Sequence, residues 1–274
     1  MYSKIQYSKL YSTANIFRTG RSDCCILFVH GFSESSICWE DVSTKFKGHV
    51  NLVTYDCIGH GNNASLWKQA SFESYTDQLD ELINYLLEYE KFTKIILVGH
   101  SQGASIAMQY SMKNPNKVYK LILVSPITYI DNALESLWNN FIKLVEKGQI
   151  ERFWDINSSL LLGPKSKEWS HFRGNAIQKR LEFFSQEHLL SLMKALLDIN
   201  IEKDLSILSN KITHLIHGEY DAMFPNYYSK SILKYLPNAE YIEVAGANHL
   251  LIELEPHISR ALMEFVNDLS TSSL

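Results

Sequence analysis

The chain has 274 residues, of which 46% are hydrophobic and 20% are charged, and its net charge is −4 with a pI near 6.2. This composition is close to that of an average globular protein, so it excludes disorder and allows one large core or two small ones. The slight acidity and the lack of any Lys/Arg run argue against nucleic-acid binding, which normally needs a basic patch.

The N-terminal segment and the cysteines argue against export, membrane insertion and metal binding. Residues 1–17 alternate polar and apolar residues, unlike a secretory signal, and no stretch reaches the roughly 18 apolar residues of a membrane span. The cysteines show no C-x-x-C spacing of a zinc or redox centre. We therefore expect a reduced, cytoplasmic setting. The cysteines are Cys24, Cys25, Cys38 and Cys57.

The first half of the chain alternates short apolar runs with helical patterns. The runs 25–29 and 51–55 are continuous rather than alternating, as expected for strands buried on both faces of a parallel sheet. In chain order we expect strands near 4–10 and 13–18, a polar turn at 19–23, strands at 25–29 and 51–55, a helix over 72–90, a strand at 94–98, a helix over about 102–113 and a strand at 121–124.

Residues 127–205 interrupt this alternation with a helical pattern, no convincing strand, and three of the five tryptophans. Strand–helix alternation implies an α/β fold with a mostly parallel sheet and helices on both faces, so we expect a core of 1–126 and 206–274 with 127–205 inserted over one edge. The alternation resumes with a strand at 212–216, a helix near 226–235, a strand at 240–244 and a last helix that opens at Pro256. The large aromatic residues of the insertion are Trp138, Phe141, Trp154, Trp169, Phe172, Phe183 and Phe184.

Residues 97–103 read LVGHSQG, a serine between two glycines directly after a buried strand and before a helix. This strand–turn–helix setting is typical of a nucleophile elbow, a sharp turn that exposes a serine hydroxyl. Residues two before and two after the serine must then be small, as Gly99 and Gly103 are. The N-terminus of the following helix favours a developing anion. We interpret Ser101 as a nucleophile.

A serine nucleophile needs an imidazole to take its proton and a carboxylate to orient that imidazole. On a fold of this kind the chain order is serine, acid, histidine. Asp221 and Glu219 both follow the strand 212–216, and His249 follows the strand 240–244. The ends of parallel strands meet at one edge of the sheet, so we expect His249 and one of these acids near Ser101.

The chain resembles the α/β-hydrolase superfamily over about residues 25–126 and 210–268. The resemblance implies an α/β-hydrolase fold, favours Asp221 over Glu219 as the acid, and assigns the oxyanion hole to the backbone N–H groups of Phe32 and Gln102. It also implies that 127–205 is a helical cap, or lid, and that the reaction needs no metal and no organic cofactor. The matching motifs are FVHGF at 28–32, YDCIGHG at 55–61, GHSQG at 99–103, HGEYD at 217–221 and NHLLIELEP at 248–256.

These residues predict a serine hydrolase that cleaves a carboxylic ester or thioester through an acyl-enzyme. The apolar side chains of 127–205 predict a neutral, apolar acyl or aromatic group on the substrate. Three alternatives stay open: a hydrolase of C–C bonds in β-diketones, an acyl thioesterase or acyltransferase, and a receptor that binds without turnover. The expected partner is a small molecule, an acyl carrier remains open, and the chain is expected to be a monomer or dimer.

The remaining histidines are expected to have structural roles. His30 and His60 lie in the loops of the HGF and GHG motifs, and His100 should point away from the site. His214 and His217 should pack in a strand and a loop, because two histidines without a third ligand make a poor metal site.

Overall fold

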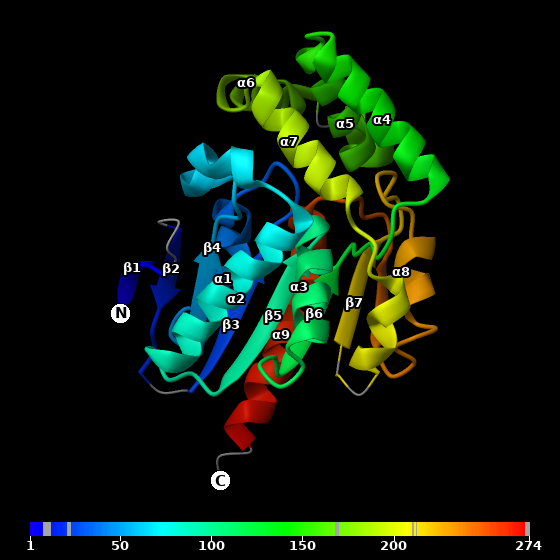
Figure 1. The fold of residues 1–274 in the computed structure, drawn as a ribbon. Helices are drawn as coiled ribbons and strands as arrows, with labels where there is room; N and C mark the ends of the chain where they lie inside the picture. Colours follow the sequence, from blue (N-terminus) through cyan, green and yellow to red (C-terminus); the bar gives the residue numbers. More distant parts are fainter. Residues whose placement is uncertain (8–11, 21–22, 168–169, 210, 212, 272–274) are drawn as a thin grey trace.

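An eight-stranded sheet forms the centre of the computed structural model, which describes residues 1–7, 12–20, 23–167, 170–209, 211 and 213–271 (Figure 1). The strand order is β1-β2-β4-β3-β5-β6-β7-β8; the β1–β2 and β2–β4 pairs are antiparallel and the others are parallel. The strands are β1 Tyr2–Gln6, β2 Thr13–Phe17, β3 Cys24–Val29, β4 Asn51–Tyr55, β5 Lys94–His100, β6 Lys120–Val124, β7 Thr213–Gly218 and β8 Glu240–Val244.

Helices cover both faces of this sheet, and each face has its own hydrophobic cluster. Along β5, Ile95 and Leu97 belong to one cluster while Ile96 and Val98 belong to the other. The strand is a continuous apolar run because both of its faces are buried. The predicted α/β architecture is thereby confirmed. On one face lie α2 (Phe72–Glu88), α3 (Gln102–Lys113) and α8 (Tyr227–Ile232), and on the other lie α1 (Glu40–Phe46) and α9 (Leu251–Thr271).

Four further helices form a layer above the carboxyl ends of the strands (Figure 1). Neighbouring aromatic rings of this layer, Trp138, Phe141, Phe153, Trp154 and Phe184, have centroids 4.6–5.7 Å apart. Most of the aromatic surface that stands out in the sequence is therefore the layer's own core. The helices are α4 (Asn132–Glu146), α5 (Ile150–Leu162), α6 (Ser170–Phe183) and α7 (Gln186–Leu197).

The last helix begins earlier than the sequence predicts: α9 starts at Leu251 and contains Pro256. Asn248 Oδ1 accepts the Leu250 N–H at 2.8 Å, and Glu253 Oε2 accepts the Asn248 N–H at 2.7 Å, so the helix is already capped before the proline. The predicted start at Pro256 is therefore wrong, because capping and burial of Leu251 outweigh the local preference of proline for a first turn.

Other differences are small. The helix predicted at 226–235 is shorter in the structure, where it is α8 (Tyr227–Ile232). The helix α1 and the 3-10 helix η2 (Gly61–Gln69) have no counterpart in the sequence prediction. Parts of the predicted strands 4–10 and 212–216, of the turn 19–23 and of the aromatic set (Trp169 and the Phe172 side chain) lie outside the described residues. No helix among the described residues is long and apolar enough to span a membrane.

Candidate active site

Ser101 lies at the turn between β5 and α3. Its φ is 55° and its ψ is −123°, a positive-φ conformation that costs of order 1–3 kcal/mol in a non-glycine residue. The Ser101 N–H donates to Val124 O in the neighbouring strand β6 at 2.8 Å. The sheet therefore holds this serine in a strained conformation at its carboxyl edge.

The two glycines around this turn have no room for a side chain. A Cβ added to Gly99 would lie 2.6 Å from the Cα of Ala104, and one added to Gly103 would overlap the backbone oxygens of Val29 and His30. Because carbon atoms in contact are about 3.5–4.0 Å apart, alanine fits at neither position without a backbone shift. The small residues of the serine motif therefore have a steric cause.

Asp221 and His249 meet at the same edge of the sheet, from the loops after β7 and β8. His249 Nδ1 lies 2.6 Å from Asp221 Oδ2, and both side chains are buried. Asp221 Oδ1 accepts the backbone N–H groups of Met223 and Phe224 at 3.0 and 2.8 Å. Burial alone would raise the pKa of Asp221, but the charge and hydrogen bond of His249 lower it. An ionised Asp221 keeps the proton of His249 on Nδ1 and leaves Nε2 as the basic atom.

Ser101 and His249 line one cavity of about 30 Å³ beneath the helical layer. In the described part of the chain no hydrogen bond joins Ser101 Oγ to His249, and such bonds are often long in ligand-free sites and tighten when substrate binds. The apolar side chains that line the cavity are Phe32, Trp138, Leu161, Leu196, Met223 and Phe224.

Two backbone amides beside Ser101 are free to bind a ligand oxygen. A Cβ added to Gly31 would lie 3.1 Å from the Cβ of Ser101, so the loop that carries Phe32 passes directly beside the serine. Gln102 is the first residue of α3, where an N–H has no acceptor within the helix. Among the described residues, neither the Phe32 nor the Gln102 N–H donates to a protein acceptor.

Gly218 and Asn248, which the sequence reasoning missed, fit the loops of the acid and the histidine together. A Cβ added to Gly218 would lie 2.7 Å from Ala247 O and would overlap Asn248 O. The signals that could have found them are a glycine three residues before the acid, at a strand end, and an asparagine next to the histidine.

The helical layer also holds the histidine loop. The His249 N–H donates to Leu161 O at 3.2 Å, and Asn248 Nδ2 donates to Leu162 O at 3.3 Å, both in α5. Just after α5, Lys165 Nζ lies 2.7 Å from Glu253 Oε1 in α9. The position of His249 therefore depends on α5 as well as on the sheet.

His30 and His60 brace the loops around Ser101. His30 Nε2 accepts the Cys57 N–H at 2.9 Å, and His60 Nε2 accepts the Ser33 N–H at 3.2 Å. Burial lowers the pKa of His60 to about 3, so its ring is neutral and suited to accept this bond. Both rings connect the loop after β3 to the loop after β4.

The other acid of the HGEYD motif, Glu219, lies on the surface, whereas His217 Nε2 lies 3.5 Å from Asp221 Oδ2. Glu219 Oε2 accepts the Gly246 N–H at 2.8 Å on the surface. His217 Nδ1 lies 2.7 Å from Ser229 Oγ, and its Nε2 donates to Phe224 O at 2.8 Å. The structure thus brings Asp221, rather than Glu219, to His249.

The prediction that His100 points away from the site is wrong. His100 lines the cavity that contains Ser101, and its Nε2 donates to His249 O at 3.0 Å. The sharp turn at Ser101 ends the alternation of the strand, and the His249 carbonyl offers an acceptor on the cavity side. His100 Nδ1 lies 3.5 Å from Glu34 Oε2 in the loop after β3.

The contact between His100 and Glu34 affects the charge of the carboxyl group. Burial alone would raise the pKa of Glu34, but the hydrogen bond and charge of His100 lower it to about 2. Glu34 is therefore ionised where it faces His100.

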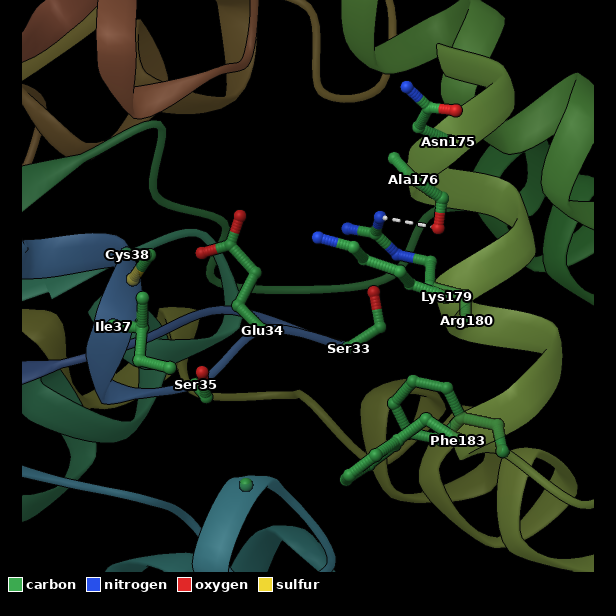
Figure 2. A pocket seen from close by; sticks show the side chains of 12 residues that line it. Ser33, Glu34, Ser35, Ile37, Cys38, Asn175, Ala176, Lys179, Arg180 and Phe183 are labelled. Carbon is green, nitrogen blue, oxygen red and sulfur yellow. Dashed lines mark hydrogen bonds between the residues drawn. The ribbon is translucent and has the colours of Figure 1, made fainter. Parts of the chain in front are cut away.

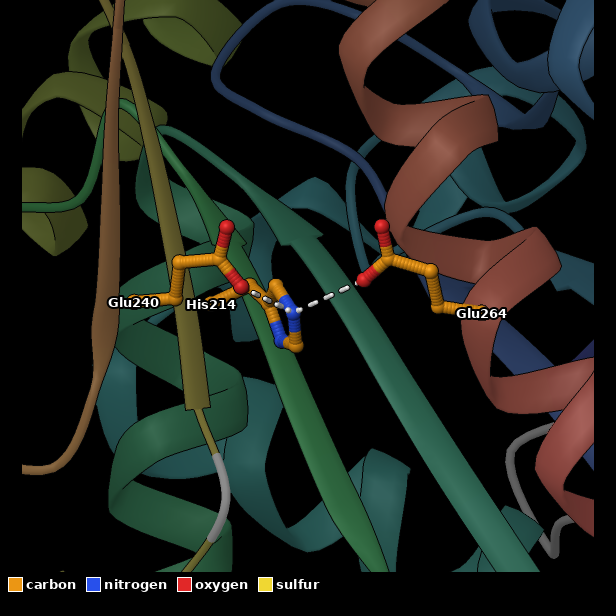
Figure 3. A group of neighbouring side chains, drawn as sticks. All are labelled: His214, Glu240 and Glu264. Carbon is orange, nitrogen blue, oxygen red and sulfur yellow. Dashed lines mark ion pairs between the residues drawn. The ribbon is translucent and has the colours of Figure 1, made fainter.

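His214 lies at the opposite edge of the sheet, at the start of β7. Its Nε2 lies 3.1 Å from Glu240 Oε2 and 3.8 Å from Glu264 Oε2 (Figure 3). Both carboxylates are more than half exposed, so we interpret the group as a surface ion-pair cluster. It is remote from Ser101 because β7 and β5 both run toward the other edge.

Comparison with known proteins identifies the family. The family model of the alpha/beta hydrolase fold matches residues 25–256. The chain belongs to this family. The match contains all the motifs that carry the resemblance in the sequence, and it includes Ser101, Asp221 and His249. The predicted α/β-hydrolase fold is confirmed.

Individual relatives are distant. An uncharacterized protein of Mycobacterium tuberculosis (strain ATCC 25618 / H37Rv) is 31% identical over 121 residues, which are 44% of this chain and 34% of that protein. Strigolactone esterase RMS3 of Pisum sativum is 28% identical over 138 residues, which are 50% of each chain. MGS-M2, an alpha/beta hydrolase enzyme from a Medee basin deep-sea metagenome library, shares the fold with a TM-score of 0.83, 19% identity and 97% coverage of both chains.

The matches to the first curated relatives span about a third of those proteins' length. The matching family model is that of the alpha/beta hydrolase fold, and one of the relatives is named an esterase.

Proposed function

We propose that this protein is a serine hydrolase that cleaves a carboxylic ester or thioester through an acyl-enzyme. The observation that carries the proposal is a serine on a strained strand-to-helix turn that shares a cavity with His249, whose Nδ1 lies 2.6 Å from Asp221. This arrangement supplies a nucleophile, a base and a group that orients the base. The esterase-named relative in Pisum sativum supports an ester as the bond.

In the proposed first half-reaction, Ser101 Oγ attacks the carbonyl carbon of the substrate while its proton passes to His249 Nε2. Asp221 stabilises the imidazolium that forms and keeps its orientation. The tetrahedral intermediate collapses, the bond to the alcohol or thiol breaks, and His249 returns the proton to that leaving group. Water then attacks the acyl-enzyme with His249 again as the base, which releases the acid and restores Ser101.

The Phe32 and Gln102 amides are proposed to stabilise the oxyanion. Among the described residues both amides lack an acceptor, and Gln102 is at the N-terminus of α3, where the helix dipole favours negative charge. Loss of one such donor typically costs about 2.7–4 kcal/mol of transition-state stabilisation. These two amides therefore provide a large part of the catalysis that we propose.

We further propose that residues 127–205 act as a cap over a core of residues 1–126 and 206–274, and that the acyl side of the substrate is apolar or aromatic. Trp138, Leu161 and Leu196 of this segment line the Ser101 cavity. A second cavity of about 50 Å³ is lined by Trp154, Ile177 and other residues of the same helices. Ligand sites are mostly apolar with a few fixed polar groups, and the cap supplies such apolar walls.

Covalent labelling tests the nucleophile. A fluorophosphonate should label Ser101 stoichiometrically, and Ser101→Ala should abolish labelling. Ser105→Ala, a buried serine in α3, is the matched control and should leave labelling intact. An adduct on another serine, found by mass spectrometry, would contradict the assignment of Ser101 as the nucleophile.

A series of p-nitrophenyl esters from acetate to decanoate tests the apolar acyl group. Each buried methylene contributes up to about 0.8 kcal/mol, so kcat/KM should rise by up to about fourfold for each added carbon until the cavity is filled. A steady fall from acetate onward would show that the cap excludes acyl chains, which contradicts this part of the proposal.

A further inference from the structure

A cavity of about 590 Å³ lies beside the catalytic one, between α6 and the loop after β3 (Figure 2). Lys179 and Arg180 extend from α6 toward the loop that carries Glu34 (Figure 2). Arg180 also lines the small cavity of Ser101 and His249. A group bound in this outer cavity would therefore lie next to the reacting centre.

Arg180 has most of its hydrogen-bonding capacity unused. A guanidinium carries five N–H donors, and in the described part of the chain its one hydrogen bond runs from Nη1 to Ala176 O at 3.5 Å. Its Cζ lies 5.4 Å from the centroid of the Trp154 ring, which restrains the group. Burial lowers the pKa of Arg180, but an arginine stays charged in proteins. A restrained, partly buried cation with free donors is suited to an anion.

Glu34 offsets only part of the positive charge in the outer cavity. The charge of its carboxylate raises the pKa of Arg180, and the same carboxylate lies 3.5 Å from His100 Nδ1. Glu34 is the one carboxylate among the residues described as lining the outer cavity, and neither Lys179 nor Arg180 forms an ion pair with another described residue. One carboxylate therefore faces two cations, Lys179 and Arg180, and the lining of the cavity keeps a net positive charge.

The rest of the outer cavity is largely apolar, with Ile37, Phe183 and Phe184 in its wall. This combination fits a ligand with an apolar body and an anionic end. A carboxylate and a phosphate can both bind a guanidinium through two parallel hydrogen bonds. The small cavity over Ser101 adjoins the outer one and shares Ser33, Glu34 and Arg180 with it. Its apolar side chains, those of Phe32, Trp138, Leu161, Leu196, Met223 and Phe224, are the surface to which we assign the acyl part.

We propose that the leaving group of the substrate carries an anionic group, a carboxylate or a phosphate, which binds Arg180 and Lys179 in the outer cavity. This inference rests on the proposed ester or thioester hydrolysis and adds the chemical class of the alcohol or thiol. It makes Arg180 a substrate-binding residue that determines specificity, because it contacts both the leaving group and the cavity of the reacting carbonyl.

Two matched pairs of substrates test the proposal and distinguish the anions. The first pair is para-carboxyphenyl butyrate against para-carbamoylphenyl butyrate, and the second is the butyryl thioester of phosphopantetheine against that of pantetheine. Hydrogen bonds to charged groups are worth about 1.5–3 kcal/mol, so kcat/KM should favour the anionic member of at least one pair by roughly 10- to 100-fold. Preference in one pair alone identifies the anion as carboxylate or phosphate.

Variants of the α6 cations should remove this preference. Arg180→Gln should bring the ratio of kcat/KM between the two members close to one, Arg180→Lys should retain part of it, and Lys179→Gln should lower it less. Lys143→Gln removes an exposed charge of α4 that lines neither cavity and should leave the ratio unchanged. A wild-type ratio near one in both pairs, or an unchanged ratio in Arg180→Gln, would overturn the proposal.

Binding to an inactive variant separates this inference from the proposed function. In Ser101→Ala, calorimetry should show tighter binding of para-hydroxybenzoate or of phosphopantetheine than of its neutral counterpart, para-hydroxybenzamide or pantetheine. Adding Arg180→Gln should abolish the difference. If no ester or thioester is cleaved but this difference is found, the hydrolase proposal fails and the anion site stands. If esters are cleaved and no difference in binding is found, the proposed anion site fails and the hydrolase proposal stands.

Discussion

Gly218→Ala should disconnect the acid from the histidine without touching either side chain. The added Cβ would lie 2.7 Å from Ala247 O and would overlap Asn248 O. Ordinary contact needs about 3.5 Å, so the loop before His249 must move by at least about 0.8 Å. Such a shift would carry the present 2.6 Å contact between His249 and Asp221 beyond the roughly 3.2 Å limit of a good hydrogen bond.

The magnitude follows from this displacement. A misplacement of about 1 Å in a catalytic site can cost about 100-fold in rate, so kcat for p-nitrophenyl butyrate should fall by roughly that factor. The strain of inserting a methyl group between backbone atoms should also lower the free energy of unfolding by roughly 1–3 kcal/mol. Steady-state kinetics and urea unfolding at the same pH measure the two effects.

Gly174→Ala is the matched control for this change. Gly174 lies in α6, and a Cβ there would meet nothing within 4 Å. Alanine is the better helix former by about 1 kcal/mol, so stability should hold or rise while kcat stays unchanged. If Gly218→Ala unfolds at the wild-type urea concentration and keeps the wild-type kcat, the close approach of the two loops is not what positions His249.

Two carboxylates should give distinct signatures. Asp221→Asn should keep the fold and lower kcat by about 10⁴, as in the best-studied triad. Because the pKa of Asp221 is lowered in the folded protein, ionised Asp221 stabilises the fold fully above its unfolded pKa of about 3.9, and this stabilisation disappears at lower pH. Urea unfolding of the variant should lack that part of the acid dependence. The pKa of Glu34 is lowered from 4.5 to about 2, so above pH 4.5 its ionised carboxylate should contribute up to about 3 kcal/mol to the free energy of unfolding. Glu34→Gln should therefore be less stable than the wild type at pH 6 and approach it near pH 2. A difference in stability that does not depend on pH would contradict the contact with His100.

Local patterns made the sheet and the serine turn predictable. The run before Ser101 is apolar because both faces of β5 are covered, and Gly99 and Gly103 are required by backbone atoms within a few residues or in the adjacent strand. The helix α3 was predicted with its observed bounds for the same reason, since its ends are set by the turn and by a proline close behind it.

Contacts between segments that are distant in the chain could not be predicted from the sequence. Nothing next to Glu34 in the chain shows that His100 will face it, and nothing near Arg180 shows that α6 will bring it to the cavity of Ser101. The early start of α9 has the same origin, because Leu251 packs against a face that other segments build. The division into a core and a cap, and the roles of the site residues, remain predictions.

The hydrogen bonds from His249 and Asn248 to the carbonyls at the end of α5 limit how substrate can enter and product can leave. If α4 to α7 swung away from the sheet as one rigid body, these bonds would pull His249 away from Asp221. His188 Nε2 of α7 donates to Gly59 O at 2.7 Å and adds a second anchor on the other side. We therefore expect substrate and product to pass through the outer cavity beneath α6 while α5 and α7 stay in place. The contact between His249 and Asp221 would then persist while product leaves.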